Sequence, residues 1–526
     1  MIQIFLRSKQ SLTHHLPSRP FGFFVAQDYN PDFKSRLESQ HLIKSDKDYR
    51  FAVVGCGPAG FYCAKQILKN VANVRVDIFD RNPHPFGLVR TGVAPDHPEM
   101  KKIEKDYEEV LKDTERCQFY GNVWIGANGG VSISKLKELY SGVILAYGAT
   151  SERDLGLPRE KSLLGILSSR QMASWYNGSL DKDVLYDQDL ALEQVQNVVI
   201  VGNGNVAMDI SRVLMKDPEK MAPHDIPTPV LEHLRKTRIN SIALVGRRGA
   251  VQSAFTIKEI REISRIPDLT MYALKQELLD SFTEASEREQ HPDFSVHARG
   301  IQRRTEFIKQ TCVILESEEQ LQEVIESKEG RKFILRYLNR PVELLGEQRV
   351  KGVKFERMRL EGSAGDQKAV AVDPKQVTTM DCELLIKSIG YKSQPIEGIP
   401  FNTKTHTVPN LMGCVLNDKD EPQPGLYVAG WLKRGPSGII DATLRDSVET
   451  FRIIKHHLDN EMLPEKHTKP EDVQRAILEN AANHQVVDYG DWQKIDAVER
   501  QEGSARGKSR EKILHKEEML SISKKV

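Results

Sequence analysis

Cysteine is scarce in this 526-residue sequence, and its spacing does not suit a metal site. The six cysteines stand singly at positions 56, 63, 117, 312, 382 and 414, and no two of them form a CxxC pair. Because structural zinc and iron–sulfur sites draw on closely spaced cysteines, the pattern predicts no resident metal and no disulfide framework. We expect all six cysteines to be reduced, structural thiols.

Long apolar runs and a large net charge are also missing. The nearest candidate for a membrane span, Phe21–Ala26, is far shorter than the roughly 20 residues that cross a bilayer, so no transmembrane segment is expected. Lysine and arginine number 75 against 74 aspartates and glutamates, which leaves a net charge of +1. A near-neutral total excludes a protein that coats nucleic acid, although a local basic face can still exist. The composition instead fits a globular enzyme.

The first 27 residues contain no acidic residue at all. They carry Arg7, Lys9 and Arg19 among several serines, threonines and leucines. A basic, hydroxylated and acid-poor N-terminus is typical of a mitochondrial presequence. We therefore expect residues 1–45 to be a presequence and linker, and an unstructured tail without a targeting role is the alternative.

Two segments far apart in the chain share one order of predicted elements. Each has a short apolar strand, a glycine-rich turn, a helix and a second strand, as in a βαβ unit. Strand, helix and strand are predicted at 49–55, 58–69 and 74–80 in the first segment, and at 197–202, 205–215 and 241–246 in the second. Several prolines between the second helix and its following strand predict an inserted loop. Two such units predict two nucleotide-binding domains.

The first turn reads Gly55-x-Gly57-x-x-Gly60, and Asp80 ends its second strand. In such a turn the first glycine allows the bend, the second lets a pyrophosphate approach the backbone, and the third lets helix and strand pack closely. The phosphate then meets backbone N–H groups at the positive end of the helix dipole. Asp80 is placed to accept hydrogen bonds from an adenosine ribose. Together these features predict a dinucleotide site.

The second turn reads Gly202-x-Gly204-x-x-Ala207, with alanine as an accepted variant in the third place. Its second strand is followed by Arg247 and Arg248, and no acid stands at the ribose position. Two guanidinium groups there suit a 2′-phosphate, which favours NADP over NAD. The alternative is a solvated arginine pair at a strand end.

A third glycine-rich segment runs from Gly430 to Ile440. A strand is predicted before it at 425–430, and a helix is predicted after it from about 439 to 458. The N-terminus of that helix would stabilise the negative charge of a reduced flavin. Trp431 could lie over the flavin ring system, and a tryptophan packed in the core is the alternative.

The remaining chain shows weaker patterns. Residues 266–300 are polar and irregular, and no structure is predicted for them. The apolar runs at 142–147 and 384–389, each followed by a glycine, are interpreted as crossovers between domains. The charged tail from Gln501 is expected to be a solvated surface helix or an extended arm.

Two further motifs, PFGLVRTGVAPDHPE at 85–99 and GWLKRGPSG at 430–438, are far more specific than a glycine triplet. Other informative stretches are VVGCGPAGFYCA (53–64), VILAYGA (143–149), GNGNVAMD (202–209), VGRRGAVQSAFTIKEIRE (245–262), SIGYKSQPI (388–396), GLYVAGWLKRGPSGIIDATLRDS (425–447) and DYGDWQKIDAVERQEG (488–503). With these motifs the chain resembles the mitochondrial NADPH:adrenodoxin (ferredoxin) reductase family along nearly all its length after the presequence. Residues 266–375 match poorly.

The resemblance implies an α/β fold with two Rossmann-like dinucleotide-binding domains, the NADP-binding domain being inserted in a discontinuous FAD-binding domain. The two parts of the FAD-binding domain are expected at 46–149 and at 396–526, the second with the C-terminal tail, and the NADP-binding domain at 150–395. The implied activity is transfer of a hydride from NADPH to FAD, followed by single electrons to a 2Fe–2S ferredoxin of the adrenodoxin type.

The resemblance also implies which residues contact each cofactor. Besides the first three glycines, FAD is expected to contact Ala59, Asp80, Leu88, Ile125, Trp431, Gly438, Ile439 and Ile440. Besides Gly202 and Gly204, NADP is expected to contact Asn203, Asn205, Val206, Arg247, Arg248, Glu259 and Gly438. Asp80 replaces the usual glutamate and has a shorter reach, and Asn203 stands where glutamine is common.

Two more sets of residues match the family by position. His97 and Asp209 match a polar pair near the nicotinamide, where a role in proton handling and a structural hydrogen bond are both open. Arg261, Arg299 and Arg303 match basic residues that receive the acidic face of the ferredoxin, and an ordinary solvated surface is the alternative. The resemblance further implies the mitochondrial matrix and no nucleic-acid partner, and it leaves peripheral association with the inner membrane open.

Three other functions are compatible with parts of this pattern. A pyridine-nucleotide disulfide reductase would need a CxxC pair beside the flavin, and an enzyme of the glutamate-synthase small-subunit type normally adds cysteine clusters. The sequence has neither. A non-catalytic accessory flavoprotein of a mitochondrial assembly stays open as the alternative, although the intact Arg247, Arg248 and glycines favour an active enzyme.

Overall fold

The computed structural model describes residues 47–126, 130–180, 190–438, 440–467, 469–480 and 485–524. The expected presequence at 1–45 and the predicted FAD contact Ile439 lie outside these residues. Packing divides the described chain into two compact units. We call residues 197–208 and 240–382 the central unit, and we call the rest of the described chain, which comes from three separate stretches, the split unit.

The split unit is built on a seven-stranded sheet with the order β18-β19-β20-β4-β1-β2-β3. Its strands are β1 (Tyr49–Val54), β2 (Val74–Phe79), β3 (Cys117–Tyr120), β4 (Gly142–Leu145), β18 (Asn410–Leu411), β19 (Cys414–Leu416) and β20 (Pro422–Val428). The five strands from β20 to β3 are parallel, whereas β18 and β19 pair antiparallel. Since β20 pairs with β4, an early and a late part of the chain form one sheet.

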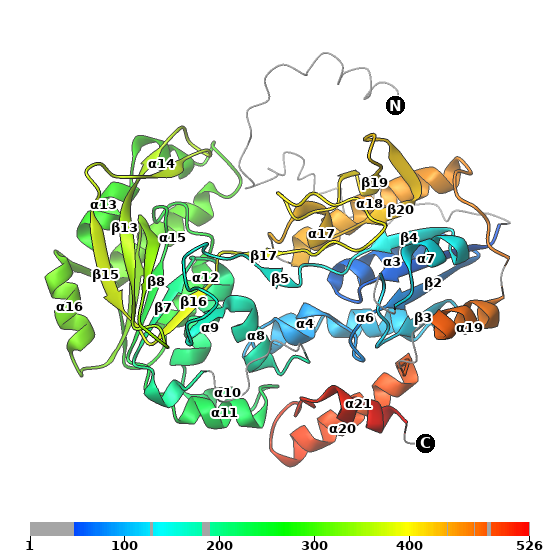
Figure 1. Ribbon diagram of the computed structural model, residues 1–526, viewed down its shortest axis with the longest axis horizontal. Helices are drawn as coiled ribbons and strands as arrows, with labels where there is room; N and C mark the ends of the chain where they lie inside the picture. The colour runs from blue at the N-terminus through cyan, green and yellow to red at the C-terminus, as the bar shows by residue number, and fades with distance from the viewer. Residues whose placement is uncertain are drawn as a thin grey trace. The chain divides into compact units, whose positions relative to one another are not determined.

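Helices cover both faces of this sheet. Successive strand residues point to opposite sides, and because residues 51–54 of β1 are apolar on both sides, each face needs a cover. Phe51 and Val53 belong to a core shared with α3 (Pro58–Asn70), α6 (Glu104–Leu111) and α18 (Ile440–Asp459). Ala52 and Val54 belong to a second core, shared with α7 (Ile133–Leu139) and α19 (Pro470–Asn480). Figure 1 shows α3 and α18 side by side on the same face. The separated chain parts therefore share a core as well as a sheet.

Shorter elements complete the split unit. They are α4 (Leu88–Thr91), α5 (Pro98–Lys101), β5 (Ser151–Glu152), β6 (Ile166–Ser168), α8 (Ser169–Asn177), the 3₁₀ helix η1 (Leu192–Gln194), α10 (Pro218–Met221), α11 (Thr228–Arg235), β16 (Leu384–Lys387), β17 (Tyr391–Lys392), α17 (Trp431–Arg434), α20 (Tyr489–Ala505) and α21 (Lys516–Ser523). The proline-rich segment expected as a loop thus contains α10 and α11. Proline is tolerated there because it occupies the first turn of each helix, where its missing N–H costs nothing.

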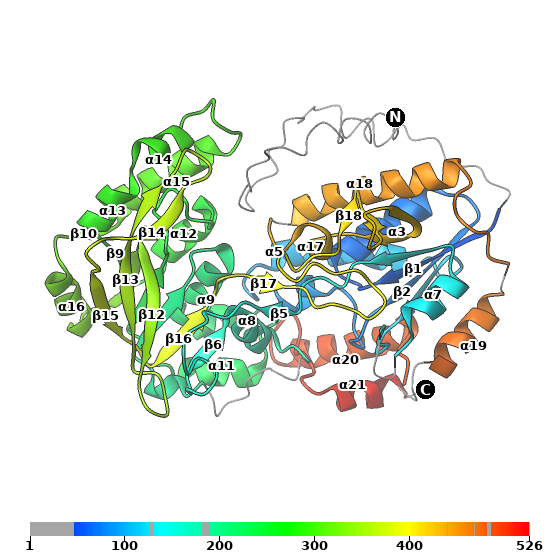
Figure 2. The same cartoon turned by 45° about the horizontal axis from the view of Figure 1, so that its top comes forward.

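The central unit holds five parallel strands in the order β10-β9-β11-β8-β7. These are β7 (Asn197–Val201), β8 (Ser241–Val245), β9 (Leu269–Leu274), β10 (Val313–Leu315) and β11 (Arg331–Arg336). Its helices are α12 (Ile257–Ser264), α13 (Lys275–Ser281), α14 (Glu284–Glu289), α15 (Ala298–Thr311) and α16 (Glu318–Glu326), and α9 (Asn205–Met215) begins in it. An antiparallel sheet follows, formed by β12 (Asn339–Leu345), β13 (Gly352–Glu361), β14 (Lys368–Ala371) and β15 (Val377–Asp381) (Figure 2).

The structure corrects one prediction about the weaker sequence patterns. Residues 266–300 are not irregular, because they contain β9, α13, α14 and the start of α15. The few buried apolar side chains of this stretch, such as Met271 and Leu278, lie among many exposed polar ones, which hides the periodicity. The apolar runs interpreted as crossovers contain the fully buried strands β4 and β16, and the crossovers themselves stay a prediction.

The C-terminal tail is also packed rather than solvated. Helices α20 and α21, red in Figure 1, lie side by side, and the segment between them buries Lys508, Arg510 and Lys512. The charges of this segment suggested a solvated tail, but their partners include residues far away in the sequence, because Lys512 contacts Asp225 and the backbone oxygen of Arg90.

The remaining structural expectations concern cysteines, domains and membranes. All six cysteines are buried, and they form no disulfide within the described chain. The borders expected for the cofactor domains stay predictions, because the two units are defined by packing and not by bound nucleotides. No helix in the described part of the chain is long and apolar enough to cross a membrane.

Candidate functional site

The glycine turn between β1 and α3 leaves an open approach to its own backbone. Gly55 has a φ of 108°, and its N–H donates to the carbonyl oxygen of Phe79 at 2.7 Å. A Cβ on Gly60 would lie 2.0 Å from the Gly55 oxygen, so only glycine lets α3 pack this closely. A Cβ on Gly57, by contrast, would meet no described atom within 4 Å. Gly57 is the N-cap of α3, so a phosphate could bind there to the free N–H groups of the helix.

Asp80 lies beside this turn, directly after β2. Its carboxylate accepts the N–H of Cys56 at 3.1 Å and the N–H of Asn82 at 2.9 Å. Burial and the Asp80 carboxylate raise the pKa of the Cys56 thiol, which stays protonated and contacts Asp80 Oδ2 at 3.1 Å. A carboxylate offers about four acceptor positions. Asp80 can therefore still accept hydrogen bonds from a ribose.

The second half of the site comes from the segment after β20. A Cβ on Gly430 would lie 2.6 Å from the Cβ of Ala59, so the two backbones adjoin at the first turn of α3. Gly430 N–H donates to the carboxylate of Asp446 on α18. Trp431 is only half-buried, with its ring 5.7 Å from that of Tyr391 in an edge-on arrangement. Its exposed part is consistent with contact to a ligand and does not fit a fully packed core tryptophan.

The loop between α17 and α18 is held in shape by Arg434. Its guanidinium donates to the carbonyl oxygen of Ser437 and, at 3.0 Å, to the hydroxyl of Thr443. Gly438 has a φ of 80°, a conformation that favours glycine. The 20-residue helix α18 then begins at Ile440. The loop therefore brings a second helix N-terminus near the first, where both can stabilise negative charge.

Two other predicted FAD contacts lie on segments that pack against this region. A Cβ on Gly87 would lie 2.9 Å from the Cα of Gly57, which places α4 and its first residue, Leu88, against the turn. The Leu88 side chain is 39% exposed, so it is free to contact a ligand. The segment leading to Ile125 is tied to the end of β2, because Val123 N–H donates to the Asp80 carbonyl oxygen at 2.8 Å.

The second glycine turn, in the central unit, repeats this geometry. Gly202 has a φ of 113°, and its N–H donates to Val245 O at 2.8 Å. A Cβ on Gly204 would meet no described atom within 4 Å, as at Gly57. Ala207 is completely buried, so the third position accepts a methyl group here. The second turn is therefore also open to a phosphate.

Side chains of this turn are fixed by the segment that leads into α12. Asn203 Nδ2 donates to Ser253 Oγ at 3.2 Å, and Asn205 Oδ1 accepts the N–H of Thr256 at 2.9 Å. Thr256 is the N-cap of α12, and its hydroxyl donates to the carboxylate of Glu259. The predicted contacts Asn203, Asn205 and Glu259 thus form one hydrogen-bonded surface next to the turn.

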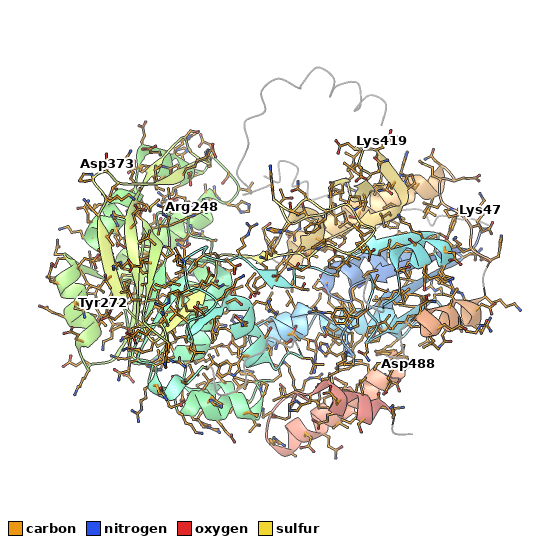
Figure 3. The ribbon with its side chains drawn as sticks, in the orientation of Figure 1. Lys47, Arg248, Tyr272, Asp373, Lys419 and Asp488 are labelled. Atoms are coloured by element: carbon orange, nitrogen blue, oxygen red, sulfur yellow. The ribbon has the colours of Figure 1, made fainter. Side chains whose placement is uncertain are left out.

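Arg247 and Arg248 follow β8 after Gly246 and are exposed; Arg248 is labelled in Figure 3. Neither arginine forms an ion pair with any residue that the structure describes. The turn therefore ends in two cationic groups that are available to an anion. The first turn instead ends in Asp80. This is the main chemical difference between the two sites.

His97 and Asp209 come together in the structure. His97 Nδ1 lies 4.0 Å from Asp209 Oδ1, and Arg212 lies next to both. Arg212 contacts Asp209 at 2.8 Å and Asp96 at 2.9 Å. Although burial alone would raise it, contacts with Arg212 and Lys216 hold the pKa of Asp96 well below its usual range.

Sequence reasoning missed Asp96 and Arg212 as members of this cluster. Two signals were present, because Asp96 precedes His97 and Arg212 is three residues after Asp209, on the same face of α9. The cluster supplies a fixed, charged environment for His97.

The three arginines expected to bind a partner lie on two packed helices. Arg261 is on α12, whereas Arg299 and Arg303 are one turn apart on α15, and the two helices are in contact. The Arg261 guanidinium lies 5.6 Å from the ring centre of Phe307 on α15. All three arginines are exposed, and none forms an ion pair within the described ranges. Arg304 is buried and bonds to two backbone carbonyl oxygens, so it is not part of this surface.

Comparison with known proteins agrees with this geometry. A family model for pyridine nucleotide-disulphide oxidoreductases matches residues 49–236. The mitochondrial NADPH:adrenodoxin oxidoreductase of Arabidopsis thaliana is 37% identical over 487 residues, which cover 91% of this chain and 96% of the relative. The Homo sapiens protein of the same name is 36% identical over 486 residues, covering 92% and 93%. The solved structure of Mycobacterium tuberculosis FprA in complex with NADPH has a TM-score of 0.77 at 31% identity, covering 91% of this chain and all of that one.

Proposed function

The chain belongs to the NADPH:adrenodoxin oxidoreductase family, and from that membership we propose how its own residues carry out the reaction. It is an FAD-dependent enzyme that passes electrons from NADPH to an iron–sulfur ferredoxin. One observation carries the proposal: two open glycine turns of the same geometry end in side chains of opposite charge. A non-catalytic accessory role is not favoured, because both turns and the arginine pair are complete.

We assign FAD to the turn at Gly57. The open backbone at that glycine suits the pyrophosphate, and Asp80 suits the adenosine ribose. The N-terminus of α18, just after Gly438, suits the charge that develops on the pyrimidine side of the flavin. Bound FAD supplies the chemistry that accepts a hydride and releases electrons one at a time. The protein's part is to bind FAD, to orient it and to stabilise the charge that develops on it.

We assign NADP to the turn at Gly204. Arg247 and Arg248 suit the 2′-phosphate, since charge-assisted contacts from guanidinium groups are strong and directional. Asn203, Asn205 and Glu259 would line the remainder of the nucleotide. His97 and Asp209 are proposed to lie near the nicotinamide, where Arg212 contacts both side chains and fixes their positions. A role for this pair in proton handling stays a prediction.

The basic surface of Arg261, Arg299 and Arg303 is proposed as the docking site for a 2Fe–2S ferredoxin of the adrenodoxin type. An acidic partner would approach three cations that form no ion pair with any carboxylate of the described residues. Such complementarity raises the rate of association more than the final affinity. The enzyme is mitochondrial, as its named relatives are, and the acid-free N-terminus supports import into the matrix. Peripheral attachment to the inner membrane stays a prediction.

The test is ferredoxin-dependent reduction of cytochrome c by the purified protein with NADPH. The expected result is a yellow protein that reduces cytochrome c only when a 2Fe–2S ferredoxin is added, and that uses NADPH in preference to NADH. Reduction of a small dye acceptor serves as the control, because it needs the flavin but not the docking surface. A flavin-loaded protein that reduces the dye but never the ferredoxin would contradict the proposal.

A further inference from the structure

Arg90 is held by the C-terminal segment at two separate points. Its guanidinium donates to Glu499 Oε1 at 2.6 Å, and its backbone carbonyl accepts from Lys512 Nζ at 3.0 Å. Arg90 belongs to α4, the short helix that follows Gly87. The last part of the chain therefore determines where this helix lies.

Glu499 is completely buried at the centre of these contacts. Besides the hydrogen bond from Arg90, the Glu499 carboxylate accepts one from the Arg510 guanidinium at 2.6 Å and one from the backbone N–H of Ile513 at 3.0 Å. Despite burial, which alone would raise it, the two arginines hold the pKa of Glu499 at about 2. The carboxylate is thus a fixed negative charge that joins α20 and the following segment to α4.

Trp492 connects Arg90 with Phe86, the first residue of the segment 86–90, which we call the loop 86–90 although it includes most of α4. Its ring lies 5.1 Å from the Arg90 guanidinium and 6.1 Å, edge to face, from the ring of Phe86. Phe86 N–H in turn donates to Cys56 O at 3.1 Å, inside the first glycine turn. Since Gly87 packs against Gly57, the loop 86–90 contacts the turn on one side and the C-terminal segment on the other.

Lys512, which contacts the Arg90 carbonyl, also contacts two other parts of the split unit. Its ammonium group donates to Asn177 O at 3.0 Å and pairs with Asp225 at 3.0 Å, and its side chain is 1% exposed. Asp225 is also paired with Lys101 at 2.7 Å. The carbonyl of Arg90, the end of α8 and the segment around Asp225 therefore meet at one buried cation.

We propose that Glu499 and Lys512 are positioning residues for FAD: through Arg90 they press the loop 86–90 against the Gly57 turn and so set the affinity for the cofactor. The inference rests on the proposed assignment of FAD to that turn. Neither residue contacts the turn itself. The chain of contacts runs from Glu499 to Arg90, from Arg90 through the Trp492 ring to Phe86, and from Phe86 to the backbone proposed to receive the pyrophosphate.

The test compares Glu499→Gln with a matched control, Glu160→Gln. Glu160 is also a buried carboxylate of the split unit, paired with Lys387, but its contacts lie at Leu155, Gly156 and Lys387 and not at loop 86–90. FAD release from diluted holoprotein is followed by the rise in flavin fluorescence, and thermal unfolding is recorded for both variants. Both should unfold at lower temperature. Only Glu499→Gln should raise the FAD dissociation constant, by about tenfold or more.

A second measurement needs no variant. Hydrogen exchange of the wild-type protein is compared with and without bound FAD. FAD should slow exchange at loop 86–90 and, equally, at residues 499 and 508–513, which lie away from the turn. Equal FAD affinity in the two variants, or protection of the loop without the C-terminal segment, would overturn the inference. Failure of the wild-type protein to bind FAD at all would instead overturn the assignment of the cofactor.

Discussion

The two glycine turns share one backbone design and differ in what surrounds it. At Gly57 and at Gly204 a Cβ would meet open space, and both turns begin with a glycine of φ near 110°. The first turn ends in the partly buried Asp80 and is backed by a loop that the C-terminal segment holds in place. The second ends in two exposed arginines. Both backbones suit a phosphate, and on the proposed assignment the surrounding side chains decide which nucleotide each turn binds and how tightly.

This difference matches the work of the enzyme. FAD must stay bound through many turnovers, and the turn proposed for it is backed by the buried contacts of Arg90 with Glu499 and Lys512. NADPH must arrive and leave, and the turn proposed for it ends in exposed cations that would attract a phosphate and could release it. Changes to the first turn should therefore act on folding and FAD retention, whereas changes to the second should act on kinetics.

The largest contrast is expected at the third position of each turn. Gly60→Ala would bring a Cβ to 2.0 Å from the Gly55 oxygen, and we expect it to destabilise the split unit by roughly 3–5 kcal/mol. Ala207→Gly, the reverse change in the second turn, should cost only about 1 kcal/mol through helix propensity. Thermal unfolding of both variants measures the difference. Equal losses would show that the two turns are packed alike.

The second-largest difference between the two units is expected in their stability at low pH. Burial and the nearby Arg90 lower the pKa of His84 to about 3, so the fold keeps this residue neutral while the unfolded chain takes up a proton below about 6.5. The stability from His84 is therefore complete above pH 6.5 and is lost as pH falls toward 3, by roughly 3 kcal/mol at pH 4. Glu499, with a pKa of about 2, adds a further loss below about pH 4.5.

Both groups lie in the split unit, which should therefore open before the central unit. Hydrogen exchange at pH 7 and pH 4 measures this by region, and His84→Asn should flatten the dependence. Acid exposure that opens the central unit first would contradict the assignment of these groups.

The arginine pair should decide the choice of coenzyme. Replacing Arg247 and Arg248 by serine should lower kcat/KM for NADPH relative to NADH by roughly two to four orders of magnitude, because each charge-assisted contact contributes roughly 1.5–3 kcal/mol. Stability should change little, since neither side chain is buried or ion-paired within the described chain. Steady-state rates with a dye acceptor measure the ratio. Equal losses for both coenzymes would mean that the pair does not read the 2′-phosphate.

The smallest effect is expected on the docking surface. Arg261→Glu should raise the ferredoxin concentration for half-maximal rate severalfold, and the effect should fade above about 0.1 M salt, where charges are screened beyond roughly 10 Å. Dye reduction should stay near the wild-type rate. Arg265→Glu, another exposed arginine next to α12, serves as a matched control for a general charge effect. Loss of both activities would place Arg261 in the fold or the NADP site instead.

Much of what distinguishes the two turns could be predicted from the sequence, because the residues that form each turn lie close together in the chain. Both βαβ units, the open glycines, Asp80 and the arginine pair follow from residues within about 50 positions of one another. Residues with distant partners could not be found that way. Lys512 is buried against Asp225 and the Arg90 carbonyl, and these distant partners are why the tail was wrongly predicted to be a solvated charged segment. Glu499, just before that tail, is likewise buried against Arg90. Arg212 was missed for a similar reason, since Asp96 comes from a different part of the chain.

The central claim is that the turn at Gly57 holds FAD and the turn at Gly204 holds NADP. A crystal structure of the protein with both bound tests it most directly. The account predicts the FAD pyrophosphate at the Gly57 backbone, its ribose at Asp80, and the 2′-phosphate of NADP within hydrogen-bond distance of Arg247 or Arg248. A 2′-phosphate bound away from both arginines, or FAD bound at the Gly204 turn, would contradict it.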